Sequence, residues 1–374
     1  MTANPPGEPS APAPKPALRI SFILSSLWLS GGVLLVIECA NHLARRGHTI
    51  YLIVPGGTVD PELANSVQPG VHLLESAAPL SAQRSIRHLF GLTLGLAKTV
   101  PSSDVIIATH TPTVVPTLLA ARWLGKGRPT WLYMDYPRMF EKRPLERFLL
   151  RFAPRWFSSI MKISAPLAGY VGQQTQATIT NVRSGLCRAE LFFDQPRLPK
   201  QTGERRVLYV GDDRPRKGLR EFIQAADLIF LNIPNLKLVI AAKTPCPVPI
   251  RTPHEFHLRP SDEQLSELYR SSDLFVSTSW GEGLGLPPLE AMACATPVVL
   301  TDSDGVRDYA QHEQNCLVAP PRDVPAIAKA MERVLCDPLF AKQLVEQAQS
   351  TARQYNWETM ADKVENALGG LLRA

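Results

Sequence analysis

Eight short runs of almost wholly apolar residues, rich in β-branched and aromatic side chains, alternate along this chain with stretches of helical pattern. They lie at residues 19–25, 49–55, 104–110, 130–135, 206–212, 236–242, 273–279 and 296–302. Strands that helices cover on both faces have this continuous apolarity, whereas strands with one wet face alternate between apolar and polar residues. The pattern therefore predicts parallel sheets in doubly wound α/β domains.

The length of the chain predicts more than one domain. A chain of 374 residues exceeds one ordinary core, so two domains of about 150–200 residues are expected. Residues 194–204 are polar, contain prolines and follow neither a helix nor a strand period, which is typical of a linker. The predicted parts are a disordered proline-rich tail (1–17), an N-terminal Rossmann-like domain (18–195), a C-terminal Rossmann-like domain (196–354) and a last helix that packs back on the first domain (355–374).

Three features bear on the cellular compartment. Residues 18–40 are apolar for long enough to span a membrane, but Gly31 and Gly32 interrupt the run and a strand, a glycine turn and a buried helix fit it better. The opening residues lack the apolar core of a signal peptide. The six cysteines show no CxxC pair, which favours small buried residues in a reducing compartment. We expect a cytoplasmic protein.

The stretch SWGEGLGLPPLEAM at 279–292 places two carboxylates around a glycine-rich loop. The loop follows an expected strand, and its prolines suit the first turn of a helix, so the helix start forms an anion site. Glu282 lies in the loop, and Glu290 lies about one turn into the helix. A phosphate flanked by hydroxyl-rich groups, as in a nucleotide sugar, would match this arrangement. The alternative is a capped helix with two solvated glutamates.

This stretch and its continuation, SWGEGLGLPPLEAMACATPVVLTD and then TDSDGVRDYAQHEQNCLVAPPRDVPAIAKAM, resemble the donor-site signature of the retaining glycosyltransferases of family four, the group 1 glycosyltransferases. The resemblance covers most of residues 205–345 and the first half more loosely. It implies a GT-B fold, in which two Rossmann-like domains face a cleft and the second binds the donor. It also implies that Glu282 contacts the transferred sugar and Glu290 the ribose. The amides that would face donor hydroxyls and phosphate belong to Gly283, Leu284 and Gly285.

A second anion-binding element is expected in VLYVGDDRPRKGLREFIQAA, a strand, turn and helix at 207–226. Two cations, Arg216 and Lys217, lie at the helix entry and suit a diphosphate leaving group; an ordinary surface pair is the alternative. Lys217 matches the family's lysine, whereas Asp212 stands where many members have arginine. Arg214 or Arg216 would supply that charge, ranked after Lys217. No acidic cluster at a strand end suggests a metal site, so we expect neither a metal nor another cofactor.

The first half resembles the family's opening strand and Gly-Gly loop in RISFILSSLWLSGGVLLVIECANHLARRGH. Gly31 and Gly32 would approach the donor from across the cleft, although a tight strand-to-helix turn explains them equally well. Two polar residues, His110 and Asp135, end expected strands where the family often contacts the transferred sugar. We prefer Asp135, for orientation and charge stabilisation, because a lone histidine is more often structural.

Residues 137–157 interleave basic and aromatic side chains at helical spacing. They hold six Arg/Lys, two Glu and five Phe/Trp, a pattern that suits an anionic membrane surface; an amphipathic helix on the core is the alternative. Residues 83–100 are a weaker example. Residues 1–200 carry a net charge of +10, from 21 Lys/Arg and 11 Asp/Glu, and residues 201–374 one of −4, from 19 and 23. Nucleic acid is disfavoured as a partner because no binding motif accompanies the charge.

The sequence therefore predicts a retaining, metal-independent glycosyltransferase of the hexosyltransferase type. It would move a sugar from a nucleoside-diphosphate sugar to a glycan or lipid-linked acceptor, in cell-surface polysaccharide or glycolipid synthesis. We expect it in the cytoplasm, peripheral on the inner face of the cell membrane. The alternatives are an epimerase or hydrolase on the same fold and a non-catalytic nucleotide-sugar-binding protein. A nicotinamide oxidoreductase is disfavoured because G-x-G-x-x-G is absent.

Overall fold

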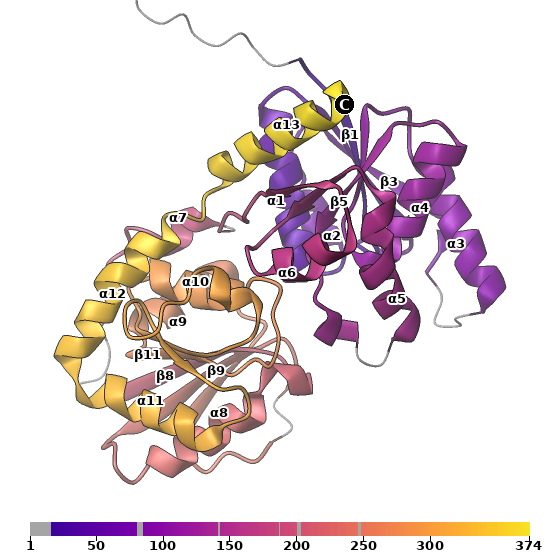
Figure 1. The fold of residues 1–374 in the computed structure, drawn as a ribbon. Coiled ribbons are helices and arrows are strands. Elements are labelled where there is room, and N and C mark those ends of the chain that lie inside the picture. Colours follow the sequence, from indigo (N-terminus) through magenta and orange to yellow (C-terminus); the bar gives the residue numbers. More distant parts are fainter. Residues whose placement is uncertain (1–15, 81–84, 141–142, 187, 200–202, 246–247) are drawn as a thin grey trace, which may run out of the picture.

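Two α/β domains make up the protein in this computed structural model (Figure 1). It describes residues 16–80, 85–140, 143–186, 188–199, 203–245 and 248–374. Of the predicted proline-rich tail, residues 1–15 lie outside the described residues. Residues 18–40, considered as a membrane span, form a strand, a turn and a helix. No described helix combines the length and apolarity that crossing a membrane requires.

The first domain is built on a seven-stranded sheet in the order β3-β2-β1-β4-β5-β6-β7. Every neighbouring pair is parallel, as the continuous apolar runs predict. Central strand β1 pairs Ile20 with Ile50 on one side and with Val105 on the other, and all three side chains are fully buried. The strands are β1 (Arg19–Ile23), β2 (Thr49–Gly56), β3 (Val71–Pro79), β4 (Val105–Ala108), β5 (Arg128–Tyr133), β6 (Ser159–Lys162) and β7 (Thr178–Asn181).

The second domain repeats the design with a six-stranded sheet in the order β10-β9-β8-β11-β12-β13. Its pairs are also parallel, and the reversal of strand order beside β8 is where such sheets bind ligands. The strands are β8 (Arg205–Gly211), β9 (Leu236–Ala242), β10 (His254–Leu258), β11 (Leu274–Ser277), β12 (Val298–Thr301) and β13 (Leu317–Ala319).

Helices and short helical turns connect the strands. Those that start in the first half are α1 (Gly31–Arg45), α2 (Pro61–Asn65), α3 (Ile86–Thr99), η1 (Thr111–Thr113), α4 (Val114–Leu118), η2 (Leu119–Trp123), η3 (Pro137–Phe140), α5 (Pro144–Phe152), η4 (Ala153–Trp156), α6 (Leu167–Val171), η5 (Gly172–Gln174) and α7 (Ala189–Phe192). Those of the second half are η6 (Pro215–Lys217), α8 (Leu219–Ile229), α9 (Asp262–Ser271), α10 (Leu286–Ala293), η7 (Gly305–Asp308), α11 (Val324–Cys336), α12 (Pro338–Ala352) and α13 (Trp357–Arg373).

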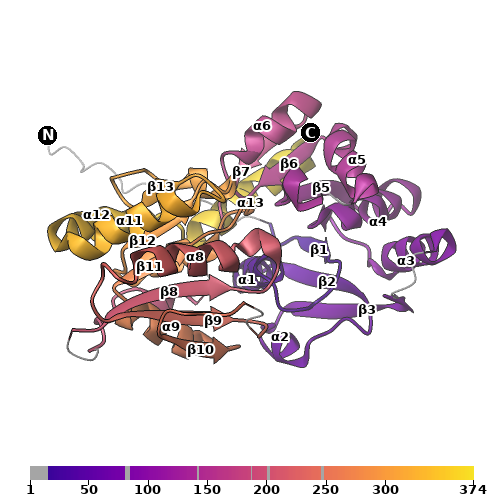
Figure 2. The ribbon, with the colours of Figure 1, turned by 90° about the horizontal axis from the view of Figure 1, so that it is seen from below.

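The last helix, α13, lies beside α1 of the first domain (Figures 1 and 2). Arg46, the C-cap residue of α1, forms ion pairs with Glu358 at 2.5 Å and Asp362 at 2.7 Å. Trp357 packs so closely on Gly185 that an added Cβ would lie 2.5 Å from its ring, and its Nε1 donates to the Leu186 carbonyl at 2.8 Å. The chain therefore crosses between the domains twice, which ties the two halves together.

The two domains also touch directly at Asp308, whose side chain is fully buried. It accepts a hydrogen bond from the Ala165 amide of the first domain, accepts another from the Tyr355 hydroxyl at 2.5 Å, and lies 3.5 Å from Arg183. Nearby, Ser164 Oγ donates to the Gly283 carbonyl at 3.3 Å. These contacts fix the first domain against the glycine-rich loop of the second.

Candidate active site

Two loops of the second domain, 212–218 and 278–285, are joined by their main chains. The Trp280 amide donates to the Arg216 carbonyl at 2.7 Å, and Thr278 Oγ1 donates to the Gly218 carbonyl at 2.7 Å. Gly218 has φ +70°, and a Cβ there would lie 2.1 Å from the Thr278 carbonyl oxygen. Only glycine tolerates both conditions, so the sequence RKG brings its two cations directly to the second loop.

Lys217 and Glu282 form the closest charged pair of this site. Lys217 Nζ lies 2.6 Å from Glu282 Oε1, and the Arg216 guanidinium lies 3.7 Å from Glu282 Oε2 and donates to the Gly281 carbonyl at 3.0 Å. Burial alone would raise the pKa of Glu282, but Lys217 and Arg216 outweigh it and hold that pKa below its usual value. The carboxylate is therefore ionised and held beside two cations.

The glycine-rich loop ends at the N-terminus of α10. Gly285 has φ +82°, and its carbonyl accepts a hydrogen bond from the Tyr309 hydroxyl at 2.7 Å. The loop that follows β12 is hydrogen-bonded to the glycine-rich loop, because the Glu282 amide donates to the Ser303 carbonyl at 2.8 Å. Among the described residues, no hydrogen bond is donated by the amides of Gly283, Leu284 or Gly285. These donors, with the helix start behind them, suit an anion.

Glu290 lies on α10, and its side chain contacts a second helix. Tyr269 of α9 donates its hydroxyl to Glu290 Oε2 at 2.8 Å. Burial raises the pKa of Glu290 to about 7, because a carboxylate loses its hydration there. Lys243, which follows β9, is close enough to favour the ionised form of Glu290, while burial and Lys217 lower the pKa of Lys243 itself. The donor side thus carries a second, titratable carboxyl group.

The first domain faces this site with its Gly-Gly loop. A Cβ on Gly31 would lie 3.8 Å from Leu286 Cδ1, at the start of α10. A Cβ on Gly32 would lie 2.8 Å from His110 Nε2, so the absence of a side chain lets the histidine ring approach α1. Gly32 therefore has a steric reason, whereas a side chain on Gly31 would make only ordinary contact with Leu286.

Asp135 and Arg214 have local partners. Asp135 is buried, and its Oδ2 accepts hydrogen bonds from the Thr111 amide at 2.8 Å and the Thr111 hydroxyl at 2.7 Å, so it anchors the turn after β4. Arg214 donates to both oxygens of Asp212, at 2.8 and 2.6 Å. The charge of Arg214 is therefore largely neutralised by Asp212, and its rank below Lys217 and Arg216 stays a prediction.

The acidic pair of TDSDG does not gather metal ligands. The Arg307 guanidinium donates a hydrogen bond to each carboxylate oxygen of Asp302, both at 2.6 Å. In the part of the chain that the structure describes, no group of three His, Cys, Asp or Glu side chains could hold a metal ion. Metal independence stays a prediction.

Two residues of the site were missed by sequence reasoning. Lys243 follows the expected strand LKLVIAA, and a charged residue at that carboxyl end was a usable signal. Tyr269 had no such signal, because it lies in an ordinary amphipathic helix and meets Glu290 only through packing of α9 on α10.

Residues 192–351 match the family model described as glycosyl transferases group 1. An uncharacterized glycosyltransferase of Methanocaldococcus jannaschii is 31% identical over 176 residues, which are 44% of this chain and 45% of that protein. The chain thus spans about half the length of that relative. The putative glycosyltransferase EpsD of Bacillus subtilis is 27% identical over 288 residues, 69% of this chain and 75% of that protein.

Among solved structures, Anabaena Alr3699/HepE in complex with UDP and glucose superposes with a TM-score of 0.77. The alignment covers 94% of this chain and 100% of that one at 19% sequence identity. At this identity the likeness establishes the fold, and together with the two parallel sheets it confirms the GT-B architecture.

Proposed function

We propose that this chain, whose residues 192–351 match the family model described as glycosyl transferases group 1, transfers a sugar from a nucleoside-diphosphate sugar to an acceptor hydroxyl. The observation that carries the proposal is the Lys217–Glu282 pair at 2.6 Å, beside the glycine-rich loop that starts α10. Cations, helix-end amides and two carboxyl groups lie together there. In such a donor the cations and amides would meet the diphosphate, and the carboxyl groups would meet hydroxyls of the sugar and the ribose.

Charge development explains the donor half of the reaction. When the bond between the sugar and the diphosphate breaks, negative charge grows on phosphate oxygens. Lys217, Arg216 and the amides of residues 283–285 would neutralise it in fixed positions, without a metal. Glu282 would accept hydrogen bonds from hydroxyls of the transferred sugar, and Glu290 from the ribose. HepE was solved with UDP and glucose, which supports the same class of ligand here.

The first domain would hold the acceptor. Gly31 lies near Leu286 at the start of α10, and Gly32 lies against His110. Asp135 follows β5, and its carboxylate would orient the turn that bears Thr111. We propose that the acceptor hydroxyl attacks from the face that the diphosphate leaves, so that the sugar keeps its anomeric configuration. No side chain of this wall is assigned as a general base.

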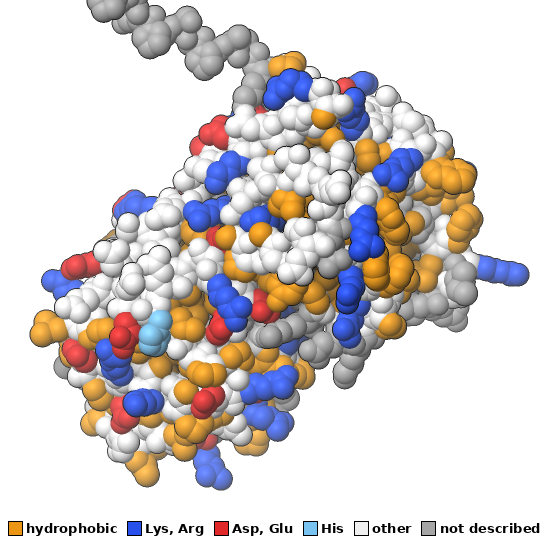
Figure 3. Space-filling view, in the orientation of Figure 1, with side chains coloured by type: hydrophobic (Ala, Val, Ile, Leu, Met, Phe, Trp, Pro, Cys, Tyr) orange, Lys and Arg blue, Asp and Glu red, His pale blue; other side chains and the backbone are white. Residues whose placement is uncertain are grey.

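We propose a membrane-facing surface on the first domain. Phe90 of α3 is 68% exposed, Trp123 of η2 is 84% exposed, and Leu145 and Phe148 of α5 are 58% and 52% exposed. Figure 3 shows hydrophobic side chains interspersed with Lys and Arg where Figure 1 places α3 and α5. Basic groups with exposed aromatic side chains favour an anionic bilayer surface. A lipid-linked or membrane-resident acceptor, in cell-surface polysaccharide or glycolipid synthesis, fits this surface.

A nucleotide screen tests the proposed function. The thermal unfolding midpoint would be measured with UDP, GDP, ADP, dTDP and CMP, and with NAD and NADP. A ligand that binds only the native state raises this midpoint, so one nucleoside diphosphate should raise it and name the donor class. Lys217→Ala should abolish the shift. A rise with NAD or NADP alone would overturn the proposal.

Product analysis separates transfer from the alternatives on the same fold. With the donor identified by the screen, a hydrolase or epimerase would consume it without an acceptor. A transferase consumes it only slowly until an acceptor glycan is added, and it attaches the sugar with retained configuration. A protein that binds the donor and leaves it intact with every acceptor would be a binding protein.

A further inference from the structure

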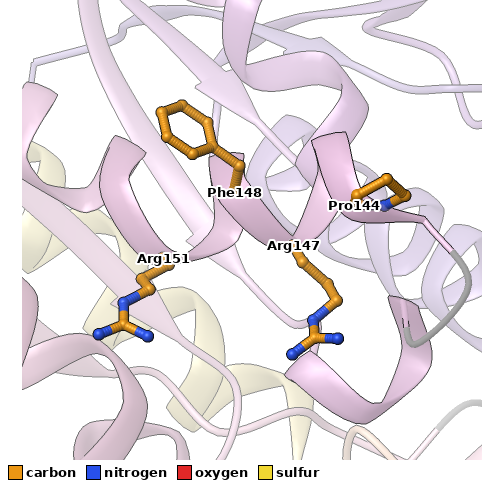
Figure 4. Close-up of a pocket in the computed structure, with 4 residues that line it drawn as sticks. All are labelled: Pro144, Arg147, Phe148 and Arg151. Carbon is orange, nitrogen blue, oxygen red and sulfur yellow. The ribbon is translucent and has the colours of Figure 1, made fainter.

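Two neighbouring pockets of the first domain share the lining residues Arg147 and Arg151 of α5. The outer one, of about 280 Å³, is completed by Pro144 and Phe148. Figure 4 shows both arginine side chains pointing to the same side of α5, away from Phe148. Residues four apart share one helix face, so the two arginine side chains border the same volume.

The inner pocket, of about 200 Å³, lies between α5, η3 and α6. Tyr133, at the end of β5, and Tyr170 and Gln173 line it together with the two arginines. One water occupies about 30 Å³ in the liquid, so a phosphate group with part of its ester fits this space. Aromatic walls, an amide and two guanidinium groups make the pocket cationic and able to donate hydrogen bonds.

The two arginines have no ionic partner in the part of the chain that the structure describes. Arg143, one turn earlier, lies 4.0 Å from Glu146, whereas no described carboxylate lies within ion-pair distance of Arg147 or Arg151. The Arg151 guanidinium lies 5.8 Å from the centre of the Phe152 ring. Two adjacent like charges repel each other at this spacing, so an anion bound between them would relieve that repulsion.

Side-chain contacts link the wall of the inner pocket to the donor loop of the second domain. The Tyr170 ring meets the Tyr136 ring edge-on at 5.3 Å. Tyr136 Oη lies 3.0 Å from Ser164 Oγ, which donates to the Gly283 carbonyl of the donor loop. Tyr170, Tyr136 and Ser164 therefore connect the wall of the pocket to the donor loop.

We propose that Arg147 and Arg151 form a phosphate subsite, and that the acceptor carries a phosphate ester near the hydroxyl that is glycosylated. The inference rests on the proposed function, because it assigns the pocket to the acceptor. Arginine forms two parallel hydrogen bonds with a phosphate, and two of them facing one volume suit a dianion better than an uncharged glycan. The ester is that of a soluble sugar or of a lipid.

Binding of two probes to the full-length protein tests the subsite. Inorganic phosphate represents the soluble source, and decyl phosphate represents the lipid source. All variants carry Lys217→Ala, which removes competing binding at the donor site. The test variant is R147Q/R151Q, and the control is R143Q/R155Q, which removes the same charge from the same segment without touching either pocket lining. Unfolding midpoints without probe verify that each variant folds.

We expect R147Q/R151Q to bind at least one probe about tenfold more weakly or worse, because charge-assisted hydrogen bonds are lost, while R143Q/R155Q binds as its parent does. Loss with both probes indicates a soluble or lipid ester, and loss with decyl phosphate alone indicates the lipid ester. Equal weakening in both double variants would mean general surface charge and would overturn the subsite, as would unchanged binding in R147Q/R151Q. Nucleoside diphosphate binding by protein with native Lys217 reports separately on the proposed function.

Discussion

The Lys217–Glu282 pair shows how one contact joins stability to ligand binding at the scale of a residue. Glu282 is a carboxylate that is only 13% exposed, and its nearest cation is Lys217. Removing that partner leaves a charge without its main compensation, which usually costs about 1–3 kcal/mol. We therefore expect Lys217→Ala to lower the free energy of unfolding by about that amount, measured by urea denaturation, and to weaken nucleoside diphosphate binding at least tenfold.

Arg214→Ala is the control for this prediction. Arg214 forms an ion pair with Asp212 at 2.6 Å, so removing Arg214 should weaken nucleotide binding far less than Lys217→Ala does. In Lys217→Ala/Glu282→Gln the carboxylate is also gone, and part of the lost stability should return. Equal nucleotide affinity in wild type and Lys217→Ala would contradict the donor-site assignment.

Glu290 gives the site a pH dependence. Burial raises the pKa of Glu290 to about 7 from its usual 4.5, so in the ligand-free protein this group contributes stability that is complete below pH 4.5 and is lost as the pH rises through about 7. A ribose binds best to the ionised carboxylate, so binding releases a proton. Affinity for the nucleoside diphosphate should rise up to about tenfold between about pH 6 and about pH 8.

Calorimetric titration at several pH values checks this expectation, with Glu290→Gln as the comparison. The terminal phosphate of the nucleotide titrates near pH 6 and contributes in both proteins, so the difference between their profiles isolates Glu290. Parallel profiles would show that Glu290 does not meet the ribose as a carboxylate.

Sequence reasoning reached the charged residues of this site other than Lys243, because their order along the chain carries the chemistry. Arg216 and Lys217 precede a glycine that must adopt positive φ, and Glu282 precedes a helix start. What it could not reach is contact between distant segments. Tyr269 meets Glu290 across 21 positions, and the Asp135 carboxylate is held by Thr111, a partner that no local pattern names.

At the scale of elements, the expected strands all formed, and the strands that sequence reasoning missed are short, at a sheet edge, or more polar. β10, with HEFHL, is an edge strand only partly buried, and β13 has three residues. Edge strands have one solvated side, so their composition resembles that of loops. Central strands such as β4, with VIIA, are apolar throughout and are recognisable.

At the scale of elements, we expect helix α5 to bind the protein to anionic vesicles. Leu145 and Phe148 are exposed beside its basic residues. Protein should float with vesicles of phosphatidylglycerol and less with phosphatidylcholine alone, and added salt should weaken binding. Leu145→Ser/Phe148→Ser should lose most of it, since the apolar contact is removed.

The matched control for α5 lies on the second domain. Leu231 is 91% exposed and Leu339 is 77% exposed, so Leu231→Ser/Leu339→Ser removes similar apolar area from elsewhere on the surface. This variant should float as wild type does. If both double variants lose binding to the same degree, the membrane contact is not at α5.

At the scale of the whole molecule, Asp308 couples the domains and leads to a separate prediction. Its buried carboxylate accepts one hydrogen bond from the Ala165 amide of the first domain and another from the hydroxyl of Tyr355, which precedes α13. The same carboxylate forms an ion pair with Arg183. Asp308→Ala removes the acceptor for all three groups and should loosen the cleft. The radius of gyration from small-angle X-ray scattering should increase, and turnover with donor and acceptor should fall at least tenfold, because productive geometry tolerates little displacement.

Nucleotide binding distinguishes this coupling role from a role in the donor site. Lys217, Glu282 and Glu290 all lie in the second domain, so Asp308→Ala should bind the nucleoside diphosphate nearly as well as wild type. Asp302→Ala is the control, since Asp302 is an aspartate of the same loop whose partner, Arg307, lies in its own domain; it should leave the scattering profile and turnover almost unchanged. If Asp308→Ala weakens nucleotide binding as much as Lys217→Ala does, Asp308 belongs to the donor site, and the domains are held by their other contacts.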